Sequence, residues 1–482
     1  MYDKLVEYSN SDYYPMHMPG HKRNKEMLKM VNPYSIDITE IDGFDNLHHA
    51  EGILREEMSH AAALYGSEHT NYLVGSSTSG ILTGVAACTK KGDKILVARN
   101  SHKAVYHAIY LNELVPIYIY PQQEEHFGIN GGISPKTVEE LLRDHQDIKL
   151  IIITSPTYEG VLSDVKTIGE IAHKYMIPLL VDEAHGAHLG FHPGFPKSSV
   201  KLGADIVIHS VHKTLPAFTQ TGLIHVNGKL VDYEEVQRYL GIYQSSSPSY
   251  LLMASIEQCV TLLEQRQEEL FSKYEKRLRL FYDRMNQLKN LEILTREKVK
   301  KAGFYDLDSS KITISVKGSN ITGNQLYYNL LKPYKLQMEM VSKDYVLGMT
   351  SICDTEEGFQ RLGDALLEID FKLCDSVIVT NESNQGSAGV GDRSRNQNMP
   401  EIVMLSHKAY EEPNEVLPLS DSIGRVSAEY LYLYPPGIPL LVPGERINKS
   451  LVADIVGYKE SGLSIQGMQE RDGEFIKVVV EK

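Results

Sequence analysis

Between Tyr65 and Ile224 short apolar runs alternate with segments of helical periodicity, and this pattern restricts the fold more than any other feature. It predicts an α/β fold, with a mostly parallel sheet and helices on both faces. Ligands of such sheets bind beyond the carboxyl ends of the strands, so chemistry is expected there. The apolar runs predict strands at residues 94–98, 150–154, 178–182 and 205–209. The polar residues that follow these strands are His102, Thr154–Glu159, Asp182–His185 and Ser210–Lys213.

The chain is long enough for several cores, and its patterns change along its length. An apolar stripe at helical spacing from Ser255 to Leu291 predicts a domain-connecting helix, with a free-standing coiled coil as the alternative. Residues 380–400 contain few apolar side chains and are rich in Gly, Ser and Asn, which is typical of a flexible linker. We therefore expect an N-terminal segment, a large domain, a connecting helix with a small α/β domain, a linker and a C-terminal domain, at residues 1–64, 65–254, 255–376, 377–400 and 401–482.

Charge and cysteine content exclude several classes of protein. A net charge of −14 argues against a nucleic-acid-binding surface. The four cysteines lie far apart, without the spacing of a zinc site or of a disulfide scaffold. No apolar run approaches the roughly twenty residues that span a bilayer, and the polar N-terminus does not read as a signal peptide. A cytoplasmic protein without membrane or nucleic-acid partners is therefore expected.

Three motifs at successive strand ends carry the chemistry. The segment GSSTSG, residues 75–80, leads into a helical pattern, which would place backbone N–H groups, Ser77 and Thr78 around a phosphate. Asp182 ends an apolar run, and a buried carboxylate there needs a cationic partner. Lys213 follows the next strand. An amine, a carboxylate and an anion site together are what a phosphorylated pyridine aldehyde requires, namely an imine partner, a counter-ion for the ring nitrogen and a phosphate site. His102 adds a ring that could stack on such a cofactor.

The same residues allow two rival interpretations. The string Asp182-Glu183-Ala184-His185 occurs in one class of helicase, but the phosphate loop GxxxxGK[ST] that such enzymes need is absent. His185 and His188, with Asp182 before them and His192 after, could ligate a metal, but that leaves Lys213 and GSSTSG without a role. A simple helix cap remains the ordinary interpretation of GSSTSG taken alone. We therefore expect no metal site.

Taken together, the motifs resemble those of the fold-type I pyridoxal-phosphate decarboxylases of ornithine, lysine and arginine. The shared motifs follow the family's order along nearly the whole chain: HMPGHKR, DITEIDGFDNLH, GSSTSG, RNSHKAVYHA, TSPTYEG, VDEAHGAHLGFHP, HSVHKT, QSSSPSYLLMAS and YPPGIPLLVPGE. The resemblance implies the fold-type I architecture with smaller α+β C-terminal domains. It also implies decarboxylation of a basic L-amino acid, in the service of polyamine synthesis. The larger bacterial members carry an extra N-terminal domain, whereas here the MPGHKR motif begins at Met18.

The resemblance assigns roles to individual residues. Lys213 forms the imine with pyridoxal phosphate, Asp182 pairs with the pyridine nitrogen, and His102 stacks on the ring, with His185 close to it. The resemblance also implies a homodimer in which Ser246 and Ser247 reach the phosphate of the neighbouring subunit. The remaining residues expected around the phosphate are Ser77, Thr78, Ser210 and His212.

The sequence leaves the substrate open. Arginine ranks slightly above lysine and then ornithine. The acidic residues Asp37, Glu40, Asp42 and Asp45 could meet the distal cation of the substrate, although an exposed acidic loop explains them equally well. An aminotransferase or carbon–sulfur lyase of the same fold is the alternative activity, and a catalytically silent binding homologue is the alternative from another class.

Overall fold

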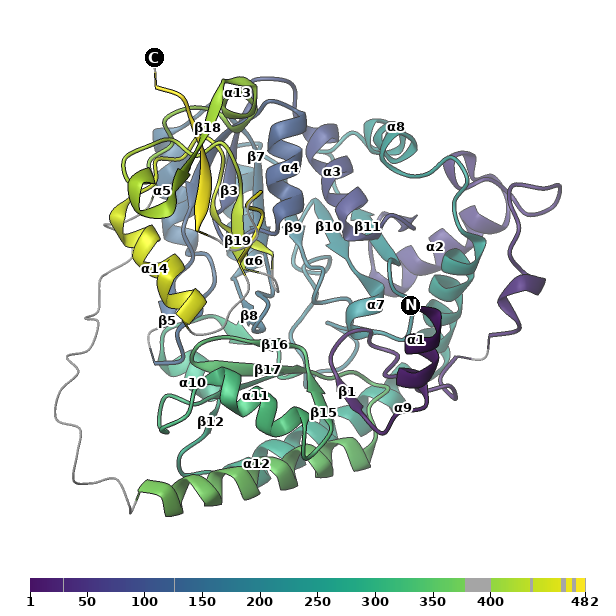
Figure 1. The fold of residues 1–482 in the computed structure, drawn as a ribbon. Coiled ribbons are helices and arrows are strands. Elements are labelled where there is room, and N and C mark those ends of the chain that lie inside the picture. Colours follow the sequence, from purple (N-terminus) through teal and green to yellow (C-terminus); the bar gives the residue numbers. More distant parts are fainter. Residues whose placement is uncertain are drawn as a thin grey trace.

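The computed structural model describes residues 1–28, 30–124, 126–377, 400–433, 437–460, 465–469 and 474–481. Its centre is a seven-stranded sheet in which all neighbouring strands are parallel except at β11, which runs antiparallel to both of its neighbours (Figure 1). The mostly parallel sheet predicted from the sequence is therefore confirmed. The strands in spatial order are β2 (His69–Leu73), β11 (Gly222–Val226), β10 (Ile206–His209), β9 (Leu179–Asp182), β7 (Ile148–Thr154), β3 (Lys94–Ala98) and β4 (Val115–Ile119).

Alternate side chains of the central strands enter two different cores, because successive residues of a strand point to opposite faces. Ile152 of β7 lies in one core, whereas Ile151 and Ile153 lie in the other. The first core is covered by α3 (Ser76–Cys88), α4 (Lys103–Leu111) and α8 (Tyr233–Tyr243). The second is covered by α5 (Pro135–Asp144) and α6 (Val165–Lys174). Helices thus cover both faces, as predicted.

One long helix connects the central sheet to a smaller antiparallel one. Helix α9 (Tyr250–Met285) buries Leu270, Phe271 and Tyr274 in a third core, where it packs against α2 (Ile53–Tyr65) and α12 (Glu356–Val377). The coiled-coil alternative is therefore wrong. The smaller sheet has the order β12 (Glu292–Ile293), β14 (Lys311–Ser315), β17 (Tyr345–Met349) and β16 (Met340–Val341). Around it lie α10 (Arg296–Lys301), α11 (Gly323–Leu331), β15 (Leu336–Met338), and the pair β8 (Val161–Leu162) and β13 (Asp306–Leu307).

The N-terminal segment joins the small sheet region to the centre of the molecule. After α1 (Tyr2–Ser9), β1 (Tyr14–Met16) pairs in parallel with β15. The chain then turns toward α7 (Val211–Thr214), the short helix that carries Lys213, where Gly20 N donates to His212 O at 2.7 Å. A Cβ atom at Gly20 would lie only 2.6 Å from Leu215 O, so this close approach requires glycine.

Residues 400–481, called here the C-terminal unit, pack beside the central sheet, where α13 (Ser406–Glu411) contacts α4 (Figure 1). The predicted linker lies mostly outside the described residues, which omit 378–399, and Tyr434–Pro436 of the proline-rich loop also lie outside them. Within the described ranges, no helix is both long and apolar enough to cross a bilayer. The other elements of the unit are β18 (Asn414–Pro418), β19 (Leu431–Leu433), β20 (Ile438–Leu441), α14 (Lys449–Glu460), β21 (Ile465–Gln466) and β22 (Phe475–Val479).

Candidate active site

A cavity of about 450 Å³, called here the main cavity, lies at the carboxyl ends of the central strands. Parallel strands bring the residues that follow them to one edge of the sheet, so motifs far apart in the sequence meet there. Ser210 is buried at the start of α7 (Val211–Thr214), the short helix that carries Lys213. The sequence-predicted residues that line the cavity are Ser77, Thr78, His102, Asp182, His185, His212 and Lys213.

Lys213 contacts His185 inside this cavity. Lys213 Nζ lies 3.0 Å from His185 Nε2, and the His185 ring lies 4.6 Å from the Tyr158 ring between centroids. Burial lowers the pKa of Lys213 below its usual range, against the opposing charges of Asp182 and Glu339. Burial likewise lowers the pKa of His185 well below 6.5. The site therefore favours a neutral histidine beside an amine that loses its proton more readily than a free lysine does.

Asp182 ends β9 and is only 3% exposed. Its Oδ1 accepts a hydrogen bond from Ala184 N at 3.2 Å, and burial raises its pKa although the Lys213 charge opposes this effect. A buried carboxylate in this state is stabilised by a cationic N–H donor. The ring nitrogen of a pyridinium is such a donor.

The start of α3 lines the main cavity with Ser76, Ser77 and Thr78. The N-cap residue is Gly75, which provides no side-chain cap, so the ordinary serine or threonine cap does not explain GSSTSG. The first-turn amides of a helix have no partners within it and bind anions. Ser210 Oγ is buried and has no hydrogen-bond partner among the described residues, but Ser210 does not line the main cavity, so its contact with a phosphate stays a prediction. His212 Nδ1 instead contacts Thr221 O at 2.8 Å, which orients its ring.

These residues fit pyridoxal phosphate. The start of α3 would provide an anion site, Asp182 a partner for the ring nitrogen, and Lys213 an amine for the aldehyde. His102 is the N-cap residue of α4, where its Nδ1 accepts a hydrogen bond from Ala104 N at 3.2 Å, so the ring is held at the cavity wall.

Two groups of residues named from the sequence do not reach the cavity of their own chain. Ser246 and Ser247 are exposed on the loop after α8, and their contact with a neighbouring subunit stays a prediction. In the acidic loop, Asp45 accepts backbone hydrogen bonds from four residues and so stabilises its own turn. The role of Asp45 in the described structure is therefore to stabilise this turn. His188 Nε2 lies 3.2 Å from Asp308 Oδ1, and within the described part of the chain no group of three or more His, Cys, Asp or Glu side chains is arranged to hold a metal ion.

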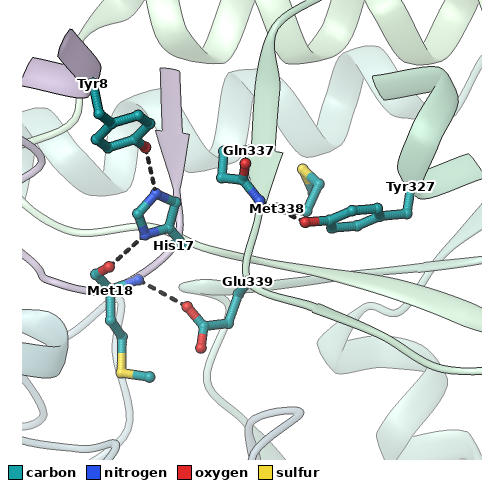
Figure 2. A pocket seen from close by; sticks show the side chains of 7 residues that line it. All are labelled: Tyr8, His17, Met18, Tyr327, Gln337, Met338 and Glu339. Carbon is teal, nitrogen blue, oxygen red and sulfur yellow. Dashed lines mark hydrogen bonds between the residues drawn. The ribbon is translucent and has the colours of Figure 1, made fainter. Parts of the chain in front are cut away.

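Glu339 is the functional candidate that motif reasoning missed. It lies between β15 and β16, and it lines both the main cavity and a second cavity of about 440 Å³ (Figure 2). Its carboxylate accepts hydrogen bonds from Met18 N, at 2.8 Å, and from the Tyr158 hydroxyl. The one feature of the sequence that could have indicated Glu339 is its position as a single acidic residue in the mostly apolar segment LQMEMV. The other residues around the second cavity are Tyr8, His17, Tyr327, Gln337 and Met338.

The buried histidines predict that the cofactor-free protein loses stability in acid. Burial lowers the pKa of His102 to about 3 and of His212 to about 4, whereas an unfolded histidine titrates near 6.5. The unfolded state therefore binds more protons below pH 6.5. The free energy of unfolding should fall as pH decreases from 6.5 toward 4, by up to about 1.4 kcal/mol per pH unit for each histidine. Thermal unfolding of wild type and of His102→Phe, measured between pH 6.5 and 4, tests this prediction. The variant should lose less stability in acid than wild type, and identical pH dependences would contradict the prediction.

Comparisons with known proteins agree along the whole chain. The family model described as Orn/Lys/Arg decarboxylase, major domain, matches residues 1–344, and the model of the C-terminal domain of such decarboxylases matches residues 392–461. Arginine decarboxylase of Bacillus subtilis (strain 168) is 32% identical, covering 100% of this chain and 98% of that protein. The constitutive lysine decarboxylase of Escherichia coli (strain K12) is 26% identical, covering 86% of this chain and 68% of that protein.

Solved structures show the same fold. The structure of the Escherichia coli constitutive lysine decarboxylase has a TM-score of 0.77 at 21% identity, covering 99% of this chain and 81% of that one. An alanine–glyoxylate aminotransferase from Nostoc sp. has a TM-score of 0.58 at 13% identity, covering 75% of this chain and 96% of that one. The predicted fold type I of pyridoxal-phosphate enzymes is therefore confirmed.

Proposed function

Because the chain belongs to the Orn/Lys/Arg decarboxylase family, we propose that it releases carbon dioxide from a basic L-amino acid with pyridoxal phosphate as cofactor. The observation that carries the proposal is the convergence of Lys213, Asp182 and the start of α3 on one cavity. Arginine is the favoured substrate, since arginine decarboxylases such as that of Bacillus subtilis are 32% identical, against 26% for the lysine enzyme of Escherichia coli. The amine product would feed polyamine synthesis.

Each residue would contribute a separate physical effect. Pyridoxal phosphate, when bound, supplies an electron sink for the bond that breaks. Asp182 would hold the proton on the ring nitrogen, because its negative charge stabilises the protonated form. The start of α3, with Ser77 and Thr78, would bind the phosphate. Lys213, whose Nζ lies 3.0 Å from His185 Nε2, would return a proton to the α carbon of the substrate.

The activity is tested by incubating the protein with pyridoxal phosphate and with arginine, lysine or ornithine separately. Carbon dioxide release from one of them would support the proposal. Formation of a keto acid without carbon dioxide would favour an aminotransferase, and sulfide release from a sulfur-containing amino acid would favour a carbon–sulfur lyase. Cofactor binding without turnover of any substrate would favour a silent homologue.

We propose Glu339 as the partner of the substrate's distal cation, because its carboxylate lines both the main cavity and the second cavity. Glu339→Gln should raise KM about 10- to 100-fold with a smaller effect on kcat, since a hydrogen bond to a charged group contributes about 1.5–3 kcal/mol. Steady-state kinetics with the favoured substrate measures this. Glu297→Gln is the matched control, because Glu297 forms a surface pair with Lys301. An unchanged KM in Glu339→Gln would reject the role.

We also propose a cytoplasmic homodimer with shared active sites. Its support is the exposure of Ser246 and Ser247 together with a group of exposed apolar side chains near the N-terminus. Sedimentation analysis should give twice the mass of 54.3 kDa. A monomer that retains full activity would reject shared sites. The exposed apolar residues are Met1, Tyr2, Leu5, Val6, Val31, Tyr34, Ile41, Phe44 and Ile53.

A further inference from the structure

One strand of the C-terminal unit reaches the main cavity. Ile438, the first residue of β20, lines this cavity together with His102 and Lys103 of the central region. Neighbouring Gly437 is buried, and its O accepts a hydrogen bond from Lys103 N at 3.1 Å. The backbone next to His102 is therefore tied directly to the C-terminal unit.

A buried ion pair holds β20 in this position. Arg99 follows β3 and is 7% exposed, and its Nη2 lies 3.1 Å from Oε2 of Glu445, which is 1% exposed. Arg99 Nη1 also donates to Pro439 O at 2.6 Å, and Nη2 donates to Leu440 O at 3.3 Å. Removing one partner of a buried pair leaves an uncompensated charge, so both side chains are needed to keep this contact.

Apolar packing also holds the C-terminal unit against the central region. Tyr430 and Val442 of the C-terminal unit belong to the same core as Tyr106 of α4 and the side chains of β3. The Tyr106 and Tyr430 rings lie 6.5 Å apart between centroids in an edge-to-face arrangement, a geometry favourable for aromatic pairs. The Lys103 Nζ lies 5.0 Å from the centroid of the Tyr432 ring. The unit is thus packed onto the end of β3 and does not merely follow it in the sequence.

We propose that the C-terminal unit forms part of the active site of its own chain, with Ile438 as a specificity-determining wall and the Arg99–Glu445 pair as the positioning device. Ile438 lines the main cavity together with His102 and so limits the space that is available there to a substrate side chain. The pair holds β20, and therefore Ile438, at a fixed position beside the backbone of His102. The role of Ile438 in specificity rests on the proposed function, whereas the positioning of His102 is testable through cofactor binding alone.

Ile438→Ala tests the wall. The shorter side chain enlarges the cavity and so changes the discrimination between substrate side chains of different length. The ratio of kcat/KM for arginine to that for ornithine should therefore change about 10-fold. Ile423→Ala is the matched control, since Ile423 is exposed in the same unit, and it should change the ratio less than about 2-fold. An unchanged ratio in Ile438→Ala would overturn the specificity role.

Glu445→Gln tests the positioning device with the cofactor-free protein. Titration with pyridoxal phosphate should show affinity at least about 10-fold weaker than wild type, because His102 loses its fixed backbone. Glu415→Gln, which breaks a surface pair with Arg425, should leave the affinity unchanged. A lower melting temperature with unchanged cofactor affinity would mean a purely structural role and overturn the positioning proposal. If Glu445→Gln does not fold, Arg99→Lys takes its place: it keeps the charge but cannot reproduce both guanidinium hydrogen bonds to Pro439 O and Leu440 O, so a smaller loss of cofactor affinity is expected and an unchanged affinity would overturn the proposal.

Different results would reject the proposed function and the proposed role of the C-terminal unit. A wild-type protein that binds pyridoxal phosphate but releases no carbon dioxide rejects the proposed function. The titration of Glu445→Gln against Glu415→Gln then still decides whether the C-terminal unit positions the cofactor site. A wild-type protein that releases carbon dioxide, with variants that match their controls, rejects the inference alone.

Discussion

Replacement of Lys213 by alanine is expected to lower carbon dioxide release by about 1,000-fold or more, which corresponds to about 4 kcal/mol of transition-state stabilisation. Lys213 Nζ lies 3.0 Å from His185 Nε2, and its charge acts on the pKa of Asp182. Under the proposed function, its removal would take away both the amine that binds the cofactor and a proton carrier. Measured activity should therefore be near background. Borohydride reduction followed by mass analysis should attach the cofactor to wild type and not to the variant.

The control for this experiment is Lys229→Ala, which removes an exposed lysine on the loop after β11. That variant should retain wild-type activity and cofactor attachment. Lys213→Ala should not destabilise the cofactor-free protein, since it removes a cation that burial already disfavours. Carbon dioxide release close to wild type in Lys213→Ala would reject its central role.

Asp182→Asn is expected to have an effect of similar size on kcat with a much smaller effect on cofactor affinity. Asparagine keeps the shape of the side chain but not the charge that would stabilise a protonated ring nitrogen. The start of α3 would still bind the phosphate. The expected loss is about 100- to 1,000-fold in kcat, or about 3–4 kcal/mol. Single-turnover kinetics with saturating cofactor separates this loss from weaker binding.

A matched substitution at the other end of the sheet provides the control. Asp147 precedes β7 and forms an exposed pair with Lys94 at 2.7 Å, so Asp147→Asn should leave kcat within about 2-fold of wild type. If Asp182→Asn turned over near the wild-type rate, the assignment of the ring-nitrogen partner would fall. Equal losses in both variants would point to a general effect of charge and not to a local one.

The large sheet and most of the cavity could be predicted because they depend on local patterns. Apolar runs define the strands, and the parallel arrangement brings the residues after them to one edge. Asp182 and Lys213 were identified in this way, since each directly follows a strand core. Ser77 and Thr78 were identified by the glycine-flanked start of a helix. The domain boundaries and the contact of Ser246 and Ser247 with a second subunit stay predictions.

The small-sheet and C-terminal contributions could not be predicted from motifs, because no local pattern encodes a contact between distant segments. Glu339 reaches the main cavity only because β1 pairs with β15 and brings Met18 N to its carboxylate. Ile438 reaches it only because Arg99 and Glu445 pair inside a common core. Each contact needs two segments to desolvate one another, and this depends on the whole fold.

The amino-acid sequence by itself determined the sheet, the strand ends and the chemical groups that a phosphorylated pyridine cofactor requires, because spacing and polarity along one segment decide these features. The tertiary structure alone decided which walls enclose those groups. Glu339 and Ile438 come from regions whose own sequence gives no reason to face a cofactor. They face the main cavity because burial and pairing of distant charges and strands place them there.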